Sequence, residues 1–93
     1  MSKFELGNIV ATKGVYDKYM SDKTFYYFVA ASLTRYAGCD WGDTCEDDKK
    51  LNDSSVKEGE RILAVYNYDE ETTIWIITEW DRSVTTILFP YEY

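Results

Sequence analysis

The chain contains no histidine, one proline, five glycines and two cysteines among its 93 residues. The lack of histidine removes the commonest general base of enzymes and a frequent zinc ligand. Cys39 and Cys45 do not form a Cys-x-x-Cys pair, and the glycines are scattered rather than gathered in a phosphate-binding loop. We therefore expect no metal, no cofactor and two free thiols.

Long apolar segments are also missing. Residues 1–10 lack the apolar centre of a signal peptide, and no apolar run approaches the ~20 residues that a membrane span needs. We expect a cytoplasmic protein without membrane contacts, in a reducing compartment where thiols stay free. The length fits a single domain, residues 1–93, with a small core.

Basic side chains are scarce: 10 Lys and Arg stand against 17 Asp and Glu, for a formal charge of −7. Nucleic-acid binding needs clustered positive charge, so this composition argues against DNA or RNA as a direct ligand. It favours a basic protein partner that is attracted over long range. The alternative interpretation is that the acidic charge only maintains solubility.

Hydrophobic patterning predicts an α+β domain. Strands are expected at residues 6–12, 61–68, 72–78 and 84–89, helices at about residues 22–37 and 44–57, and residues 15–20 are compatible with a helical turn. Ser21 is the expected N-cap of the first helix, with Gly38 and Gly59 as C-terminal stops. This order predicts an antiparallel sheet of about four strands with two or three helices packed on one face.

The helical spacing also predicts which side chains face the core. On the first helix one face carries Phe25, Phe28, Val29, Ser32, Leu33 and Tyr36. On the mostly polar second helix, Leu51 and Val56 are the expected apolar contacts. Trp75 lies in an apolar strand and is expected in the core.

The densest acidic segment surrounds Trp41 and carries Asp40, Asp43, Glu46, Asp47 and Asp48. Helical spacing would put several of these carboxylates on one face, in a first turn where the helix dipole favours anions. The structural interpretation is helix capping. The functional interpretation is a partner-binding surface whose ~5–6 Å carboxylate spacing imitates nucleic-acid phosphates. Trp41 is either a partly exposed anchor of that surface or a staple between helices.

A second acidic group, Asp69, Glu70 and Glu71, separates two predicted strands. Its structural interpretation is an ordinary polar hairpin turn. If the second helix and this sheet edge lie on the same side, the two acidic groups join into one negative surface for a partner.

Glu79, Asp81 and Arg82 are the best candidates for an enzyme site, since paired carboxylates can act as acid and base. The structural interpretation is an ion pair that fixes the turn between the last two strands. Because nothing indicates a pocket around them, we favour the ion pair and expect no enzyme.

Most of the chain resembles a family of small plasmid-related proteins, carried on plasmids, phages and other mobile elements of Firmicutes and related bacteria. The matching blocks are residues 6–12, 40–43 (D-W-G-D), 45–49, 74–79 (I-W-I-I-T-E), 81–83 and 85–90. The blocks near the C-terminus are the most specific. The chain departs from the family pattern at Cys39, Trp80 and Tyr91.

This resemblance implies an inhibitor of a host defence nuclease, anti-CRISPR or anti-restriction in effect, because small acidic proteins of mobile elements often neutralise enzymes that act on nucleic acid. The expected partner is a basic host protein, such as a CRISPR effector or a restriction enzyme, whose groove accepts carboxylates in place of phosphates. The alternative is a non-enzymatic interaction or regulatory module that binds through exposed aromatic side chains such as Trp80 or Tyr91.

Overall fold

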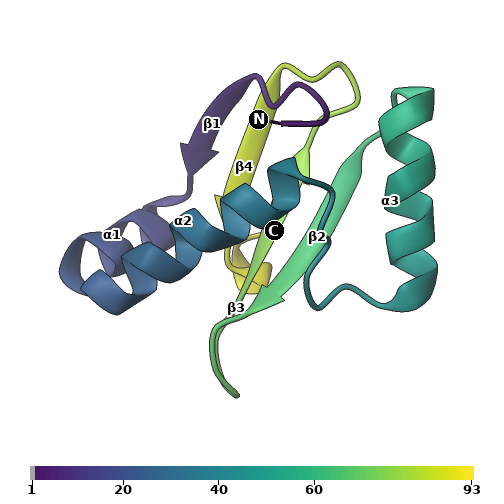
Figure 1. Ribbon diagram of the computed structural model, residues 1–93. Coiled ribbons are helices and arrows are strands. Elements are labelled where there is room, and N and C mark those ends of the chain that lie inside the picture. The colour runs from purple at the N-terminus through teal and green to yellow at the C-terminus, as the bar shows by residue number, and fades with distance from the viewer. Residues whose placement is uncertain (1) are drawn as a thin grey trace.

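The computed structural model describes residues 2–93 and confirms the α+β class (Figure 1). One sheet contains four strands in the order β1-β4-β3-β2. These are β1 (Asn8–Ala11), β2 (Ile62–Asn67), β3 (Thr73–Thr78) and β4 (Val84–Leu88). The helices are α1 (Lys13–Ser21), α2 (Lys23–Ala37) and α3 (Glu46–Glu58), and the 3₁₀ helix η1 (Pro90–Glu92) follows β4. None of the helices within residues 2–93 combines the length and apolar character of a membrane span.

The sheet is antiparallel except at one edge. β2, β3 and β4 form an antiparallel meander, whereas β1 runs parallel to β4 with Asn8 opposite Val84. The antiparallel prediction is therefore wrong for the β1–β4 pair. A hairpin forces neighbouring strands to run in opposite directions, but β1 continues into helices and its direction is set by packing.

Helix α2 begins one residue later than predicted. Ser21 is the last residue of α1, and Asp22 is the N-cap: its Oδ1 accepts hydrogen bonds from the N–H groups of Thr24 and Phe25 at 3.0 and 3.2 Å. Asp22 has an extended backbone, which is the N-cap conformation. Residues 15–20 belong to the helix α1 rather than to a single turn.

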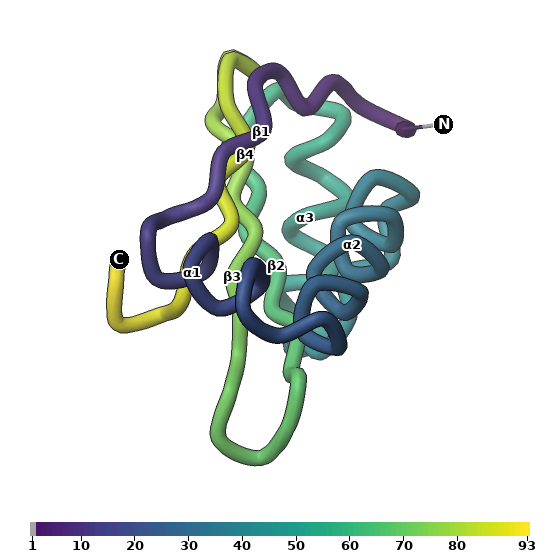
Figure 2. Tube along the Cα trace, turned by 90° about the vertical axis from the view of Figure 1, so that its left-hand side faces the viewer, coloured from purple at the N-terminus to yellow at the C-terminus, as the bar shows by residue number. Residues whose placement is uncertain are grey.

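Helices α2 and α3 lie on the same side of the sheet (Figure 2). The predicted inner face of α2 is confirmed, with Phe25, Val29, Ser32 and Tyr36 buried. Against it the sheet presents the alternate residues Ile62, Ala64, Tyr66, Ile74, Ile76 and Ile87. The expectation that Trp75 lies in the core is wrong: it projects from the opposite face, half-buried against Tyr93, with ring centroids 5.6 Å apart.

Helix α3 lies beside the edge strand β2 (Figure 1). Leu51 is 60% exposed, so its predicted core contact is wrong, whereas Val56 packs against the core as expected. The inner side of α3 instead buries Asn52 and Ser55. A helix beside a strand edge meets backbone polar groups, which polar side chains satisfy better than leucine does.

Candidate protein-binding surface

The two acidic groups lie toward the same end of the molecule, at the bottom of both views (Figures 1 and 2). One is at the start of α3 and the other is in the turn between β2 and β3. Asp43 connects them, because its Oδ2 accepts a hydrogen bond of 2.8 Å from the N–H of Asn67, the last residue of β2. We name this surface the acidic end; its exposed members are Asp43, Glu46, Asp47, Asp48, Asp69, Glu70 and Glu71.

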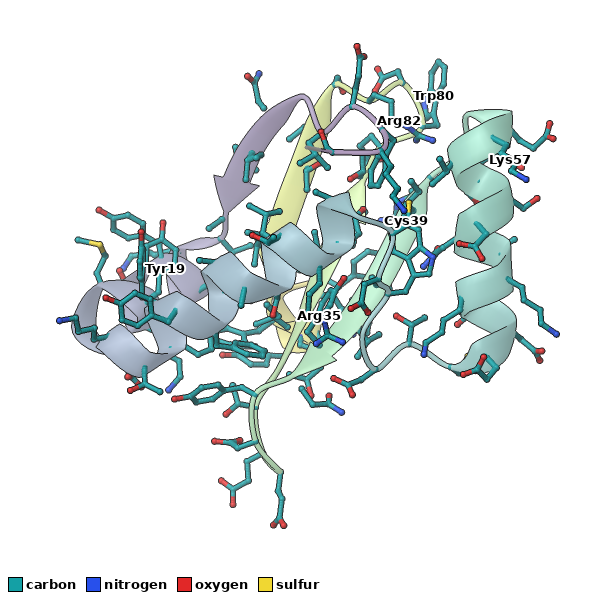
Figure 3. The ribbon with its side chains drawn as sticks, in the orientation of Figure 1. Tyr19, Arg35, Cys39, Lys57, Trp80 and Arg82 are labelled. Atoms are coloured by element: carbon teal, nitrogen blue, oxygen red, sulfur yellow. The ribbon has the colours of Figure 1, made fainter. Side chains whose placement is uncertain are left out.

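Asp40 is held by a cation and contributes little to this surface. Its carboxylate accepts hydrogen bonds from Arg35 Nε and Nη2 at 2.9 and 3.1 Å, and from the N–H of Gly42. The bond from Arg35 lowers the pKa of Asp40 and raises the pKa of Arg35. Arg35 points toward this loop from α2 (Figure 3). Asp40 therefore fixes the turn after α2.

Trp41 is buried, with 4% of its surface exposed, so its assignment as a partner-binding residue is corrected. Its ring packs edge-on against Tyr36 at 5.5 Å, and its Nε1 donates to Asp53 Oδ1 at 2.8 Å. Because Tyr36 belongs to α2 and Asp53 to α3, Trp41 is the staple between helices that the sequence offered as the alternative.

The first turn of α3 carries Glu46, Asp47 and Asp48, all exposed. The helix begins at Glu46, so Asp43 precedes it and does not share its face, contrary to the prediction. The N-cap, Cys45, makes no side-chain capping bond. The acidic side chains of the first turn instead stabilise the helix through their interaction with its dipole. Lys49 lies 3.5 Å from Glu46 and offsets part of that charge.

In the turn between β2 and β3, Asp69 has a structural role. Its Oδ1 accepts hydrogen bonds from the N–H groups of Glu71 and Thr72 at 2.9 and 2.7 Å, and these bonds lower the pKa of Asp69. The interpretation as a polar hairpin turn fits this residue. Within residues 2–93, the carboxylates of Glu70 and Glu71 accept no such hydrogen bond, and both residues are exposed at the tip of the turn.

Glu79, Asp81 and Arg82 do not form the predicted ion pair. Glu79 pairs with Arg61 at 3.7 Å, and Asp81 accepts hydrogen bonds from the N–H and hydroxyl of Ser83. These bonds from Ser83 lower the pKa of Asp81. The structure thus separates the two carboxylates into different local roles.

Arg82 binds backbone carbonyl groups instead of carboxylates. Its guanidinium donates to the carbonyl oxygens of Ser55 and Glu60 at 2.9 and 2.7 Å, and to that of Glu79 at 3.2 Å. It reaches from the β3–β4 turn toward the end of α3 (Figure 3). Carbonyls at a helix C-terminus attract cations, so Arg82 ties α3 to the sheet.

Sequence reasoning missed the residues that close the edge of β2. Asn52 Nδ2 donates to the carbonyl of Leu63 at 2.9 Å, and Thr44 Oγ1 accepts from the N–H of Val65 at 2.9 Å. Asn52 looked like one more polar residue on a polar helix. Only its place one turn before the buried Ser55 and the partly buried Val56 would have marked it as inward-facing.

The remaining candidates for chemistry are metal-ligating side chains and the two thiols. Within residues 2–93, no group of three or more His, Cys, Asp or Glu side chains is placed to hold a metal ion. Cys39 is half-buried and Cys45 exposed, both as free thiols, and burial raises the pKa of Cys39. No protein-family model, no curated protein and no solved structure matches the chain.

Proposed function

We propose that the protein is a mobile-element-encoded, non-enzymatic inhibitor of a host defence nuclease, anti-CRISPR or anti-restriction in effect, which binds the basic nucleic-acid groove of its target. The acidic end carries the proposal. Its side chains come from two separate segments and are exposed together. Within residues 2–93, Glu46 is the one member of the acidic end that pairs with a basic side chain.

Two physical arguments support this function. Adjacent carboxylates on one helical turn lie ~5–6 Å apart, a spacing on the scale of strand phosphates. A net charge of −7 steers the chain toward a basic groove and away from nucleic acid. The resemblance to mobile-element proteins points to the same class of target.

Charge reversal at the acidic end tests the proposal. The variant Glu46→Lys, Asp47→Lys, Asp48→Lys is compared with wild type in pull-downs from a bacterial lysate at low and high salt. The matched control, Glu5→Lys, Glu58→Lys, Glu60→Lys, makes the same change in net charge at exposed sites outside the acidic end. We expect wild type and the control to capture a nucleic-acid-processing protein at low salt. High salt or the first variant should abolish this capture.

A captured nuclease is then assayed for DNA cleavage with both variants. Inhibition that survives charge reversal of the acidic end would contradict the proposal. Loss of inhibition in both variants would show a requirement for net charge rather than for this surface.

The alternative, a regulatory or interaction module, is favoured by two exposed aromatic side chains. Trp80 is 67% exposed in the β3–β4 turn, and Tyr91 is 83% exposed in η1. In that case the same pull-downs give a partner that survives high salt and is lost with Trp80→Ser or Tyr91→Ser, because apolar contacts are insensitive to screening.

A further inference from the structure

The outer edge of β1 is unpaired. The N–H groups of Asn8 and Thr12 donate to carbonyls of Ser83 and Ile87 beside β4. Alternation along a strand therefore turns the backbone groups of Ile9 and Ala11 away from β4. Within residues 2–93, no side-chain, turn or loop hydrogen bond reaches the N–H or C=O of either residue. Such an edge is a template for another strand.

An apolar and aromatic surface surrounds this edge. Ile9 and Val10 are 48% and 44% exposed, although both are β-branched aliphatic residues. A hollow of about 220 Å³ opens beside them between β1 and α2, lined by Ile9, Ala11, Tyr19, Tyr26, Ala30 and Leu33 among others. Tyr19 lies at this end of the molecule (Figure 3), and the exposed Tyr16, Tyr26 and Tyr27 extend the same surface through edge-on ring contacts. Exposed tyrosines at this density are typical of protein interfaces.

The charge distribution favours this edge as the place where two copies of the chain can meet. Residues 6–12 carry no charged side chain, and β1 lies at the opposite edge of the sheet from β2 and α3 (Figure 1). Two copies of a chain with a net charge of −7 repel each other, so they associate most easily where the contact is neutral. The β1 edge meets that condition, and its free donors and acceptors match those of an identical strand.

We propose that two copies of the chain pair through their β1 strands in antiparallel orientation, about a twofold axis at Val10. In this register Ile9 of each copy exchanges both backbone hydrogen bonds with Ala11 of the other. Ile9 of the second copy then lies beside Ala11, at the hollow between β1 and α2. The two sheets become one, with the acidic ends at its far edges. This dimer does not depend on the proposed function.

Cross-linking tests the register. In a background of Cys39→Ser and Cys45→Ser, Val10→Cys brings two thiols into a non-hydrogen-bonded pair with Cβ atoms about 4.5–5.5 Å apart, near the span of a disulfide. We expect a disulfide-linked dimer under mild oxidation at micromolar protein. Leu51→Cys, on the exposed side of α3, is the matched control and should stay unlinked.

Light scattering and sedimentation over a range of concentrations test the dimer itself. Ile9→Lys puts a buried charge in the contact and should raise the dimer Kd by about tenfold or more, with a circular-dichroism spectrum like that of the control Leu51→Lys. A monomer at every concentration overturns the proposal. So does a dimer that Ile9→Lys leaves intact, or one in which Val10→Cys links no faster than Leu51→Cys.

Discussion

The two edges of the sheet differ in what satisfies their outward backbone groups. At β2, the outward groups of Leu63, Val65 and Asn67 are bonded by three side chains from outside the sheet, those of Asn52, Thr44 and Asp43. At β1, Ile9 and Ala11 have no such partner within residues 2–93. The chain therefore closes one edge against strand addition and leaves the other able to accept it.

This difference shows how an edge is protected without proline or bulges. The closing residues come from α3, which precedes β2 in the chain, and from the loop before α3. The packing of α3 against the sheet therefore also protects the edge of β2. Just after β1, the Glu92 carboxylate bonds Thr12 and Gly14 at the start of α1. Three substitutions test these supports.

The largest effect is expected for Asn52→Ala, which opens the β2 edge. Asn52 is 3% exposed, and its loss leaves the C=O and N–H of Leu63 without partners. An unsatisfied buried polar group is costly, so we expect a loss of about 2–3 kcal/mol of unfolding free energy in urea titrations. Ser54→Ala, at an exposed position of the same helix, is the control and should change stability by less than about 0.5 kcal/mol. A similar small change for Asn52→Ala would mean that α3 does not close the edge.

A smaller effect is expected for Glu92→Ala at the open side. The Glu92 carboxylate accepts bonds from the Thr12 hydroxyl at 2.6 Å and from the N–H of Gly14 at 3.2 Å, and so caps α1 in place of an N-cap side chain. We expect a loss of about 1–2 kcal/mol at neutral pH, as for other helix caps. Glu70→Ala, at an exposed turn position, is the matched control.

At low pH, the difference in stability between wild type and Glu92→Ala should disappear. Burial raises the pKa of Glu92, but the hydrogen bonds from Thr12, Phe89 and Gly14 together lower it by more. The resulting pKa lies below the ordinary value. A lowered pKa stabilises the fold above the unfolded value of about 4.3, and this contribution is lost as the pH falls below it. Wild type and Glu92→Ala should therefore converge in urea titrations near pH 3. A constant gap down to that pH would contradict the capping role.

The smallest effect at neutral pH is expected for Tyr66→Phe, on the closed side. Tyr66 in β2 is fully buried and donates to the carbonyl of Asp40 at 2.7 Å, so its loss should cost about 1 kcal/mol. Burial raises the pKa of Tyr66, hence wild type should lose stability as the pH rises above about 10, the unfolded value. The variant should lose less over the same range, as measured by Tm at pH 8 to 11. An equal loss of Tm in wild type and variant would assign the alkaline transition to another group. Tyr36 is one such group, because burial raises its pKa as well.

Patterns that depend on neighbouring residues were predicted well. The inner face of α2, its end at Gly38, the left-handed C-cap at Gly59 and the three C-terminal strands all follow from local spacing and backbone preference. The acidic residues of the candidate surface were found for the same reason, because they cluster in the sequence. Trp41 is the staple between helices that the sequence offered beside its partner-binding assignment, whereas Arg82 binds carbonyl groups instead of the predicted carboxylates.

Several contacts that the sequence did not predict join residues far apart in the chain. Glu92 caps a helix that begins about 80 residues earlier, and Thr85 donates to the carbonyl of Leu6 at 2.7 Å across a similar separation. Gly7 shows the same dependence, because a Cβ at its positive φ would lie 2.4 Å from the carbonyl oxygen of Arg82. No local pattern encodes such contacts.

Composition and periodicity alone therefore set the α+β class, the acidic character and most element boundaries, because charge and short-range spacing are properties of the chain itself. Packing set the rest. It placed β1 parallel to β4, joined the two acidic groups through Asp43, and closed the β2 edge while leaving the β1 edge bare. Each of these depends on which distant backbone groups meet, and hydrogen bonding between them is satisfied only once the whole chain has folded.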